Sequence, residues 1–306
     1  MAGGQERILR RRIKSVQSTK KITRAMELIA ASRIVKAQAR VHAAAPYAEG
    51  ITAVVQDLAA AGAGSNHPLL TPRERINTVA HIVITADRGL CGGYNANVIR
   101  AAESELREHA KHGREYSLVT VGRKAEGYFR YRNYRVDAAF SGFSDAPGYE
   151  NAREVAQAVA NRFVAGEIDL VQIVYTRFVS AGLQEVVVRP LMPLDTDDFT
   201  KGEAGGAPNA TYEFEPSPDG ILDALLPRYV EARVFAALLN AAASEHAARQ
   251  RAMKAATDNA DELIRNLSRI MNRARQDAIT TEIMEIVGGA EALKSGKADA
   301  DLLPID

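Results

Sequence analysis

Apolar and small residues recur every seven positions along the first part of the chain. One series of seven-residue steps starts at Leu9, and a second series starts four positions later at Ile13. The first series contains Leu9, Val16, Thr23, Ala30, Ala37, Ala44, Ile51 and Leu58, and the second contains Ile13, Lys20, Glu27, Ile34, Val41, Ala48 and Val55. Heptads sustained over more than three repeats are typical of a coiled coil. Because no glycine lies between Gln5 and Glu49, we predict a coiled-coil helix over residues 1–60.

The last part of the chain carries a similar pattern. Alternating steps of three and four residues connect Met253, Ala256, Ala260, Leu263, Leu267, Ile270 and Ala274. No glycine lies between Ile221 and Val287, so we predict a second coiled-coil helix over 218–288. A short tail is expected over 289–306.

The two predicted helices lie at opposite ends of the chain, so their pairing depends on the region between them. If that region brings Leu58 and Ile221 together, the helices run antiparallel, and the numbers of facing residues add to about 280. Gln5 then faces the neighbourhood of Arg275, and Ile279–Val287 extend beyond the first helix. Proline inside a helix removes a hydrogen bond and can bend it, so Pro46 and Pro227 are the places where this register is least secure.

The middle of the chain, residues 75–215, alternates short β-branched runs with amphipathic stretches. The expected strands are Ile76–Thr85, Ser117–Val121, Leu170–Tyr175 and Glu185–Leu191, and the expected helices are Asn95–Lys111, Arg123–Asn133 and Tyr149–Val164. A loop at Asp195–Asn209 precedes a short strand at Tyr212–Phe214. Alternating strands and helices predict a Rossmann-like α/β domain with a mostly parallel sheet. The fold class is therefore α/β, with a long antiparallel two-helix coiled coil added to the central domain.

Charge and cysteine content narrow the possible functions. The formal net charge is only +1, yet residues 6–40 carry eleven Lys or Arg and two acids. Such a basic helix usually binds a negatively charged partner, which can be nucleic acid, phospholipid or an acidic protein surface. No apolar run approaches the roughly 18 residues of a membrane-spanning helix. The single cysteine, Cys91, excludes an intramolecular disulfide and fits a reducing compartment.

The segment Asp87–Asn95, with the sequence DRGLCGGYN, is the strongest candidate for chemistry. It follows a predicted strand and opens a predicted helix, where α/β proteins often bind phosphate. Its spacing matches neither GxGxxG nor the P-loop, so we interpret it as a tight structural turn. Cys91 is interpreted as a small packed residue and His81 as a hydrogen-bonded core histidine. No HExxH, GxSxG or metal-spaced acidic cluster appears, and no catalytic residue, metal or cofactor is predicted.

Several stretches of the chain resemble the gamma subunit of bacterial F-type ATP synthases. They are IKSVQSTKKITRAMELIAAS at Ile13–Ser32, DRGLCGGYN at Asp87–Asn95, YEFEPS at Tyr212–Ser217, and the helix at Ser244–Leu293. In that family the terminal helices form an antiparallel shaft inside a ring of nucleotide-binding subunits, and the α/β domain lies below the ring.

The resemblance implies a non-catalytic central rotor shaft of the F1 sector. Such a shaft couples proton-driven ring rotation to conformational cycling of the catalytic subunits and regulates ATPase activity and proton flow. The implied partners are the alpha and beta subunits, the epsilon subunit and the membrane c-ring, with no nucleic acid and no cofactor. The implied contacts with the catalytic subunits are Met26, Arg249, Gln276, Thr280 and Glu282, and the implied foot contacts with the membrane ring are Tyr212 and Glu215.

The resemblance also implies a location. The family motif is already under way at Ile13, so no removable presequence is expected, and the chain is expected to be peripheral on the cytoplasmic face of a bacterial cell membrane. Two alternatives of other classes remain at this point. A nucleic-acid-binding coiled coil would use the basic first helix on phosphates, and a nucleotide-dependent α/β enzyme would use the turn at Asp87–Asn95.

Overall fold

The computed structural model describes residues 2–60, 67–194, 215 and 217–300. The chain divides into two compact units, one made of Met1–Met26 with Met253–Asp306 and the other of Glu27–Ala252. The first unit holds the outer ends of the two long helices, and the second holds the α/β domain with the remaining helical segments. Among the described residues, no helix combines the length and the apolar character needed to cross a membrane.

Both predicted long helices are present. Helix α1 spans Ala2–Ala60 and α6 spans Pro218–Ala300. Each accommodates an internal proline, Pro46 in α1 and Pro227 in α6, without ending there. Helix α6 also continues beyond residue 288, where the sequence analysis places its end. The glycine pair at that point lowers helix propensity but does not interrupt the helix.

The two helices pair in the first unit with the predicted register. The hydroxyl groups of Thr23 and Thr257 lie 2.8 Å apart, and Lys20 forms a salt bridge with Asp261. Both pairs fit facing residue numbers that add to about 280. The antiparallel arrangement is therefore confirmed by side-chain contacts in this unit.

The far end of α6 is exposed. Ile279 keeps 48% of its surface accessible and Met284 keeps 69%, and Ile283, Ile286 and Val287 are exposed as well. Within the described residues no segment of α1 covers this end, as the predicted register requires. Buried apolar surface stabilises a helix pair by roughly 25 cal/mol per Å², and these side chains of α6 stay exposed among the described residues.

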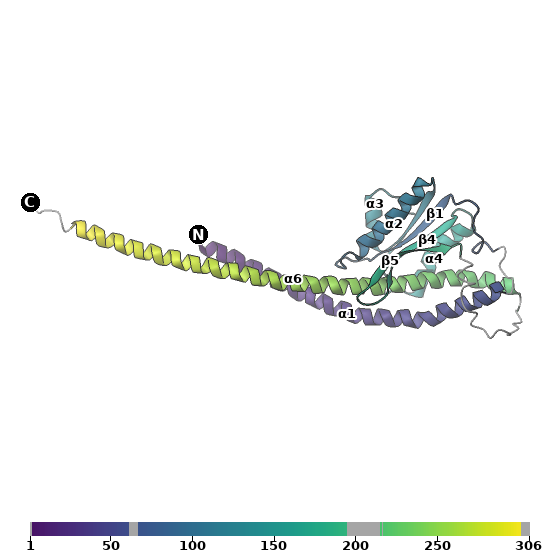
Figure 1. Ribbon diagram of the computed structural model, residues 1–306, viewed down its shortest axis with the longest axis horizontal. Coiled ribbons are helices and arrows are strands. Elements are labelled where there is room, and N and C mark those ends of the chain that lie inside the picture. The colour runs from purple at the N-terminus through teal and green to yellow at the C-terminus, as the bar shows by residue number, and fades with distance from the viewer. Residues whose placement is uncertain (1, 61–66, 195–214, 216, 301–306) are drawn as a thin grey trace, which may run out of the picture. The chain divides into compact units, whose positions relative to one another are not determined.

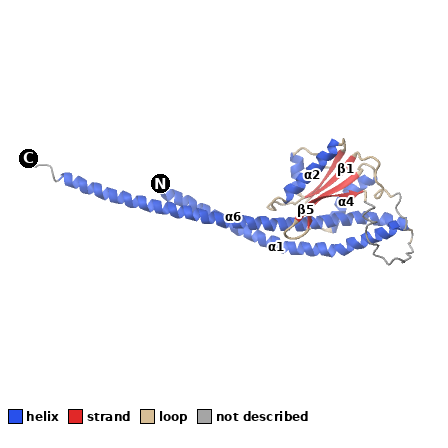
Figure 2. Cartoon of the chain, in the orientation of Figure 1, coloured by secondary structure: helices blue, strands red, loops and turns tan. Residues whose placement is uncertain are grey.

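The α/β domain contains a five-stranded sheet in the order β3-β2-β1-β4-β5. Its strands are drawn red in Figure 2. The strands are β1 (Thr78–Ile84), β2 (Glu115–Val121), β3 (Ala138–Phe140), β4 (Leu170–Phe178) and β5 (Gln184–Met192). The helices are α2 (Tyr94–Lys111), α3 (Arg123–Tyr131) and α4 (Tyr149–Val164). The first four strands are parallel, and β5 pairs antiparallel with β4. The mostly parallel sheet is thus confirmed, whereas the predicted segments Asp195–Asn209 and Tyr212–Phe214 lie outside the described residues.

Helices cover both faces of the sheet (Figure 1). On one face, Val83 and Val174 pack with Val98 of α2 and Phe129 of α3. On the other face, the opposite side chains of the strands pack with α4 and with the nearby segments of α1 and α6. This layering follows from the alternation of side chains along each strand. It brings α6 to the carboxyl ends of the central strands, where the candidate site lies.

Candidate functional site: the glycine turn and helix α6

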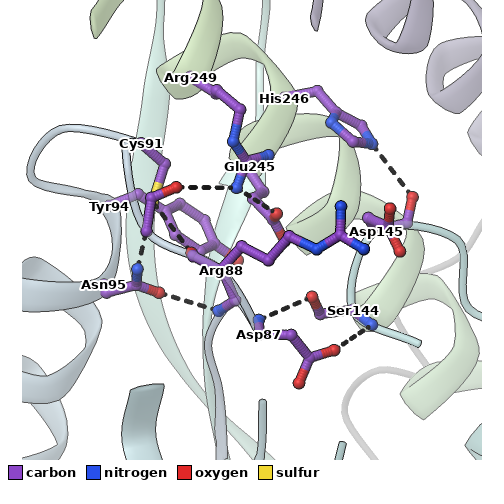
Figure 3. Close-up of polar contacts among 12 residues, drawn as sticks. Asp87, Arg88, Cys91, Tyr94, Asn95, Ser144, Asp145, Glu245, His246 and Arg249 are labelled. Carbon is purple, nitrogen blue, oxygen red and sulfur yellow. Dashed lines mark hydrogen bonds and ion pairs between the residues drawn. The ribbon is translucent and has the colours of Figure 1, made fainter. Parts of the chain in front are cut away.

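The turn between β1 and α2 is held by its own side chains (Figure 3). The Asp87 carboxylate accepts backbone N–H hydrogen bonds from Arg123, Gly142 and Ser144 at 3.1, 2.8 and 3.1 Å. The Asn95 side-chain oxygen accepts the N–H of Ala86 at 2.8 Å. The Asp87 side chain therefore joins three loops at the carboxyl edge of the sheet, and Asn95 links the two ends of its own turn.

The backbone of the same turn is unusual. Gly92 has φ of 58°, and Leu90 has φ of 62°. A leucine in the left-handed region is strained, and the Leu90 side chain is also exposed. Cys91 between them is buried, and its thiol accepts a hydrogen bond from the Asn95 amide at 3.1 Å. Burial raises the pKa of the Cys91 thiol, so it is a packed residue, as predicted, rather than an activated nucleophile.

Helix α6 docks onto this turn through Arg249, which also forms a buried ion pair within the helix. The Arg249 guanidinium donates to the Glu245 carboxylate at 2.7 Å and to the carbonyl of Gly89 at 3.3 Å. The Glu245 side chain is 2% exposed and the Arg249 side chain is 11% exposed. Burial raises the pKa of Glu245 above its usual value, and the Arg249 charge opposes that rise. The pair lies within α6 and holds the Arg249 side chain in place, and the hydrogen bond from Arg249 to Gly89 joins the helix to the turn.

Two further hydrogen bonds join α6 to the end of β4 and to the start of α2. The Ser244 hydroxyl donates to the carbonyl of Thr176 at 3.0 Å, and Tyr94 of the turn donates to the carbonyl of Ala241 at 3.2 Å. In open α/β sheets, ligands bind outside the carboxyl ends of the strands where the strand order reverses, which here is the crevice between β1 and β4. Helix α6 fills that crevice.

The loop before α4 connects this arrangement to α1. Asp145 forms a salt bridge with Arg33 at 2.5 Å, and its carbonyl lies 3.1 Å from the His246 imidazole nitrogen. Arg40 also donates to the carbonyl of Pro147. Burial lowers the pKa of His246, with a smaller opposing effect from the Asp145 hydrogen bond, so this imidazole is neutral near pH 7. The loop thus contacts both long helices within the second unit.

The environment of His81 differs from the expected hydrogen-bonded one. It is buried on β1, as predicted for a core residue, but neither ring nitrogen has a hydrogen-bond partner in the described part of the chain. Its ring lies 5.3 Å from that of His109, and burial, followed by the His109 charge, lowers the pKa of His81 to about 3. The imidazole is kept neutral by exclusion of water rather than by hydrogen bonding.

The implied contact residues fall in different parts of the structure. Met26 is half-buried in the first unit, and Gln276, Thr280 and Glu282 lie on the exposed end of α6 in that same unit. Gln276 and Thr280 are joined along the helix, because the Thr280 hydroxyl donates to the Gln276 carbonyl at 3.0 Å. Arg249 belongs instead to the second unit and to the buried pair. Of the foot residues, Glu215 is exposed, and Tyr212 lies outside the described residues.

Sequence reasoning missed Glu245, Ser244, His246 and Asp145 as members of this site. The available signal was the stretch SEHAAR at Ser244–Arg249, where an acid, an imidazole and a cation interrupt an alanine-rich helix. Charged residues on an apolar helix face usually have partners. No group of three or more His, Cys, Asp or Glu among the described residues could hold a metal ion.

Comparison with known proteins identifies the family. A family profile described as ATP synthase matches residues 5–293. The chain is 54% identical over 297 residues to the ATP synthase gamma chain of Frankia casuarinae, covering 96% of this chain and 99% of that relative. It is 50% identical over 305 residues to the ATP synthase gamma chain of Mycolicibacterium smegmatis, covering 95% and 98% of the two chains.

Solved structures share the fold. A chain of the Euglena gracilis mitochondrial ATP synthase, solved as OSCP/F1/c-ring in rotational state 3, matches with a TM-score of 0.69 at 18% identity, covering 99% of this chain and 98% of that one. A rotor chain of the same enzyme in rotational state 1 matches with a TM-score of 0.63 at 17% identity, covering 90% and 99%. With the profile match and the full-length relatives, these findings show that the chain belongs to the ATP synthase gamma chain family.

Proposed function

We propose that the chain is the central rotor shaft of the F1 sector of a proton-driven ATP synthase. As a gamma chain it is a non-catalytic subunit of the ATPase complex. The observation that carries the mechanism is helix α6, which runs without interruption from Pro218 to Ala300. One stretch of it is fixed to the α/β domain by hydrogen bonds from Arg249 to Gly89, from Ser244 to Thr176 and from Tyr94 to Ala241. A torque applied to that domain is therefore passed along a continuous helix to its exposed end.

The coupling follows from differential binding. A shaft with an asymmetric surface stabilises a different conformation in each surrounding subunit, so rotation exchanges the affinities of those subunits for nucleotide. The exposed end of α6 offers apolar side chains at Ile279, Ile283 and Val287 beside polar ones at Gln276 and Thr280. Apolar contacts that are similar in every orientation permit rotation, and polar contacts that form in only some orientations favour particular angles.

We further propose that Met26, Arg249, Gln276, Thr280 and Glu282 contact the catalytic subunits. The exposure of Gln276, Thr280 and Glu282 supports this assignment. For Arg249 the contact is made through the small part of the side chain that stays accessible, while its guanidinium remains paired with Glu245. The foot, represented by Tyr212 and the exposed Glu215, is proposed to face the membrane ring.

The proposed partners are the alpha and beta subunits of the F1 ring, the epsilon subunit and the c-ring. The proposed location is peripheral, on the cytoplasmic face of a bacterial cell membrane. In functional terms we keep the division into shaft segments at 1–60 and 218–288, a central domain at 75–215 and a tail at 289–306. The basic first helix then meets protein rather than nucleic acid, and the α/β domain binds the shaft rather than an enzyme substrate.

Rotation of the chain tests this function. Tyr131 is 84% exposed at the end of α3, so a Cys91→Ser, Tyr131→Cys chain offers one accessible thiol for a filament or bead. After assembly with alpha and beta subunits, ATP is expected to drive unidirectional rotation, and a non-hydrolysable analogue is expected to stop it. The isolated chain is expected neither to bind nor to hydrolyse ATP. ATP hydrolysis by the complex without movement of the attached probe contradicts the proposal.

A further inference from the structure

One stretch of α1 in the second unit borders a cavity instead of packing into the core. The cavity has a volume of about 910 Å³ and is lined by both long helices. Its alanines are Ala44, Ala45 and Ala48 of α1 and Ala232 and Ala236 of α6. In this described part of α1, none of residues 38–50 is buried, whereas Ile34 before them and Ile51 after them are buried. Apolar packing therefore contributes little to the attachment of residues 38–50.

Polar contacts attach α1 where this stretch begins. The Arg33 guanidinium forms its salt bridge with Asp145 at 2.5 Å, and the Arg40 guanidinium donates to the carbonyl of Pro147. Arg33 and Arg40 are one heptad apart, so they lie on the same side of the helix. Asp145 and Pro147 both belong to the loop between β3 and α4. This loop thus provides an attachment where apolar packing is weak.

The loop is itself fixed to the domain and to α6 (Figure 3). The Asp87 carboxylate accepts the N–H groups of Gly142 and Ser144, and the Ser144 hydroxyl accepts the N–H of Asp87 at 2.9 Å. The Asp145 carbonyl lies 3.1 Å from the His246 imidazole nitrogen of α6. The backbone of Asp145 is therefore bound to α6 while its carboxylate is bound to α1.

The exposure of the ion pair determines what its loss does. The Arg33 side chain is 45% exposed and the Asp145 side chain is 29% exposed. Pairs exposed to this degree contribute little to the free energy of unfolding. Because the backbone of Asp145 is held by its own hydrogen bond, the pair favours one position of α1 relative to the loop. Breaking the pair is therefore expected to loosen α1 locally and to leave the fold intact.

We propose that Asp145 is a positioning residue that keeps α1 attached to the α/β domain while the domain turns. This inference rests on the proposed rotor function and deepens it. The hydrogen bonds of Ser244 and Arg249 pass torque from the domain to α6, and Asp145 passes it to α1 as well. Without the carboxylate, α1 follows the domain less closely, and part of each turn is not transmitted along α1.

Hydrogen exchange of the purified full-length chain tests the attachment directly. Asp145→Asn and Arg33→Gln are each expected to speed deuterium uptake in residues 38–50 by about two- to fivefold, as the loss of a partly exposed pair allows. Glu185→Gln is the matched control, because it removes a similarly exposed pair with Arg177, at 2.6 Å, in the hairpin of β4 and β5. That variant is expected to leave uptake in residues 38–50 unchanged.

The double variant shows whether the two residues act through one contact. Arg33→Gln with Asp145→Asn is expected to exchange no faster than either single variant, because the contact can be lost only once. The midpoint of thermal unfolding is expected to change as little in these variants as in Glu185→Gln. Additive effects of the two substitutions on exchange would overturn the proposed pairing.

The assembled synthase in membrane vesicles tests the consequence for rotation. Asp145→Asn is expected to lower the amount of proton transport per ATP hydrolysed, while the complex assembles and hydrolyses ATP. Glu185→Gln is expected to keep the wild-type ratio. A change confined to stability would not alter this ratio, so the measurement separates positioning from folding.

The two measurements also separate this inference from the rotor function on which it rests. Unchanged exchange in Asp145→Asn would overturn the attachment, whatever the complex does. Faster exchange with a wild-type ratio of proton transport to hydrolysis would overturn the role of Asp145 in transmission. Failure of the wild-type chain to rotate in its complex would instead contradict the rotor function, and the inference with it.

Discussion

The hydroxyl groups of Thr23 and Thr257 lie 2.8 Å apart in the buried contact between α1 and α6. Thr23 can also donate to the carbonyl of Lys20, at 3.0 Å, and Thr257 to the carbonyl of Met253, at 2.9 Å. Each hydroxyl has one hydrogen, so one threonine donates across the pair while the other donates to its own helix. A polar pair at this depth favours one register of the helices, because sliding either helix would break the hydrogen bond between the two hydroxyl groups.

This geometry predicts strong non-additivity. Thr23→Val or Thr257→Val alone removes the cross-helix hydrogen bond and is expected to reduce the free energy of unfolding by about 1 kcal/mol. The double variant is expected to recover much of that loss, because two apolar side chains of the same shape then face each other. Urea denaturation followed by circular dichroism gives the coupling energy, and additive losses in the double variant would argue against the shared hydrogen bond.

The buried pair of Glu245 and Arg249 makes a prediction about side-chain replacement. Arg249→Met leaves the Glu245 carboxylate without its cation and is expected to cost about 3 to 5 kcal/mol of stability near pH 7. Glu245→Gln retains a hydrogen-bond acceptor for Arg249 and is expected to cost less. Thermal unfolding measures the stability of the two variants. Equal losses of stability would mean that an unpaired Glu245 carboxylate is not costly at this site.

The same carboxylate predicts a pH dependence. Burial raises the pKa of Glu245 in the folded chain above its usual 4.5, so the folded state binds this proton more tightly than the unfolded state. The stabilising contribution is complete below pH 4.5 and is lost as pH rises through the raised pKa. Glu245→Gln is expected to remove that slope. Unfolding free energies measured across this window, in wild type and variant, check the sign.

Gly122 and Gly127 form a matched pair for testing the turn after β2. A Cβ atom on Gly122 would lie 2.2 Å from the carbonyl oxygen of Thr85, and its φ is 91°. Gly122→Ala is therefore expected to lose about 3 kcal/mol of stability. A Cβ on Gly127, inside α3, meets nothing within 4 Å, so Gly127→Ala is expected to gain about 1 kcal/mol from helix propensity. Melting temperatures that move in the same direction for both variants would contradict this reasoning.

Gln276 tests the proposed contact with the catalytic subunits. Exposed polar contacts that form in some orientations are worth on the order of 0.5 to 1.5 kcal/mol, which is enough to bias one step over another. Gln276→Leu is expected to slow steady-state ATP hydrolysis or weaken its coupling to proton transport while the complex still assembles. Normal rates in an assembled variant would leave the stiffness of the shaft as the sole basis of coupling.

Much of this architecture could be predicted from local pattern. Helix α4 at Tyr149–Val164 was expected with the observed bounds, because its apolar spacing and flanking glycine are local signals. The register of the helix pair followed from the assumption that Leu58 and Ile221 lie close together. Strand β3 was missed because three residues, Ala138–Phe140, are too few to show an alternating pattern.

The candidate site depended on tertiary structure that the sequence pattern does not contain. Arg249 and Gly89 are separated by 160 positions, and nothing local to either residue indicates the other. The turn at Asp87–Asn95 was recognised as structural from its failure to match a phosphate-binding motif. That its partner would be α6 could be known only once the sheet order placed the ends of β1 and β4 beside that helix.

Helix α6 at the carboxyl ends of β1 and β4 acts as a permanently tethered ligand of its own domain. A tethered group has an effective concentration set by chain geometry, and dilution does not change it. A nucleotide in solution would therefore have to displace α6 from the crevice, and α6 is covalently part of the same chain. Changes in nucleotide concentration around the synthase therefore do not loosen the attachment of the domain to the helix. The mechanical stiffness of the subunit is for the same reason independent of the ATP concentration.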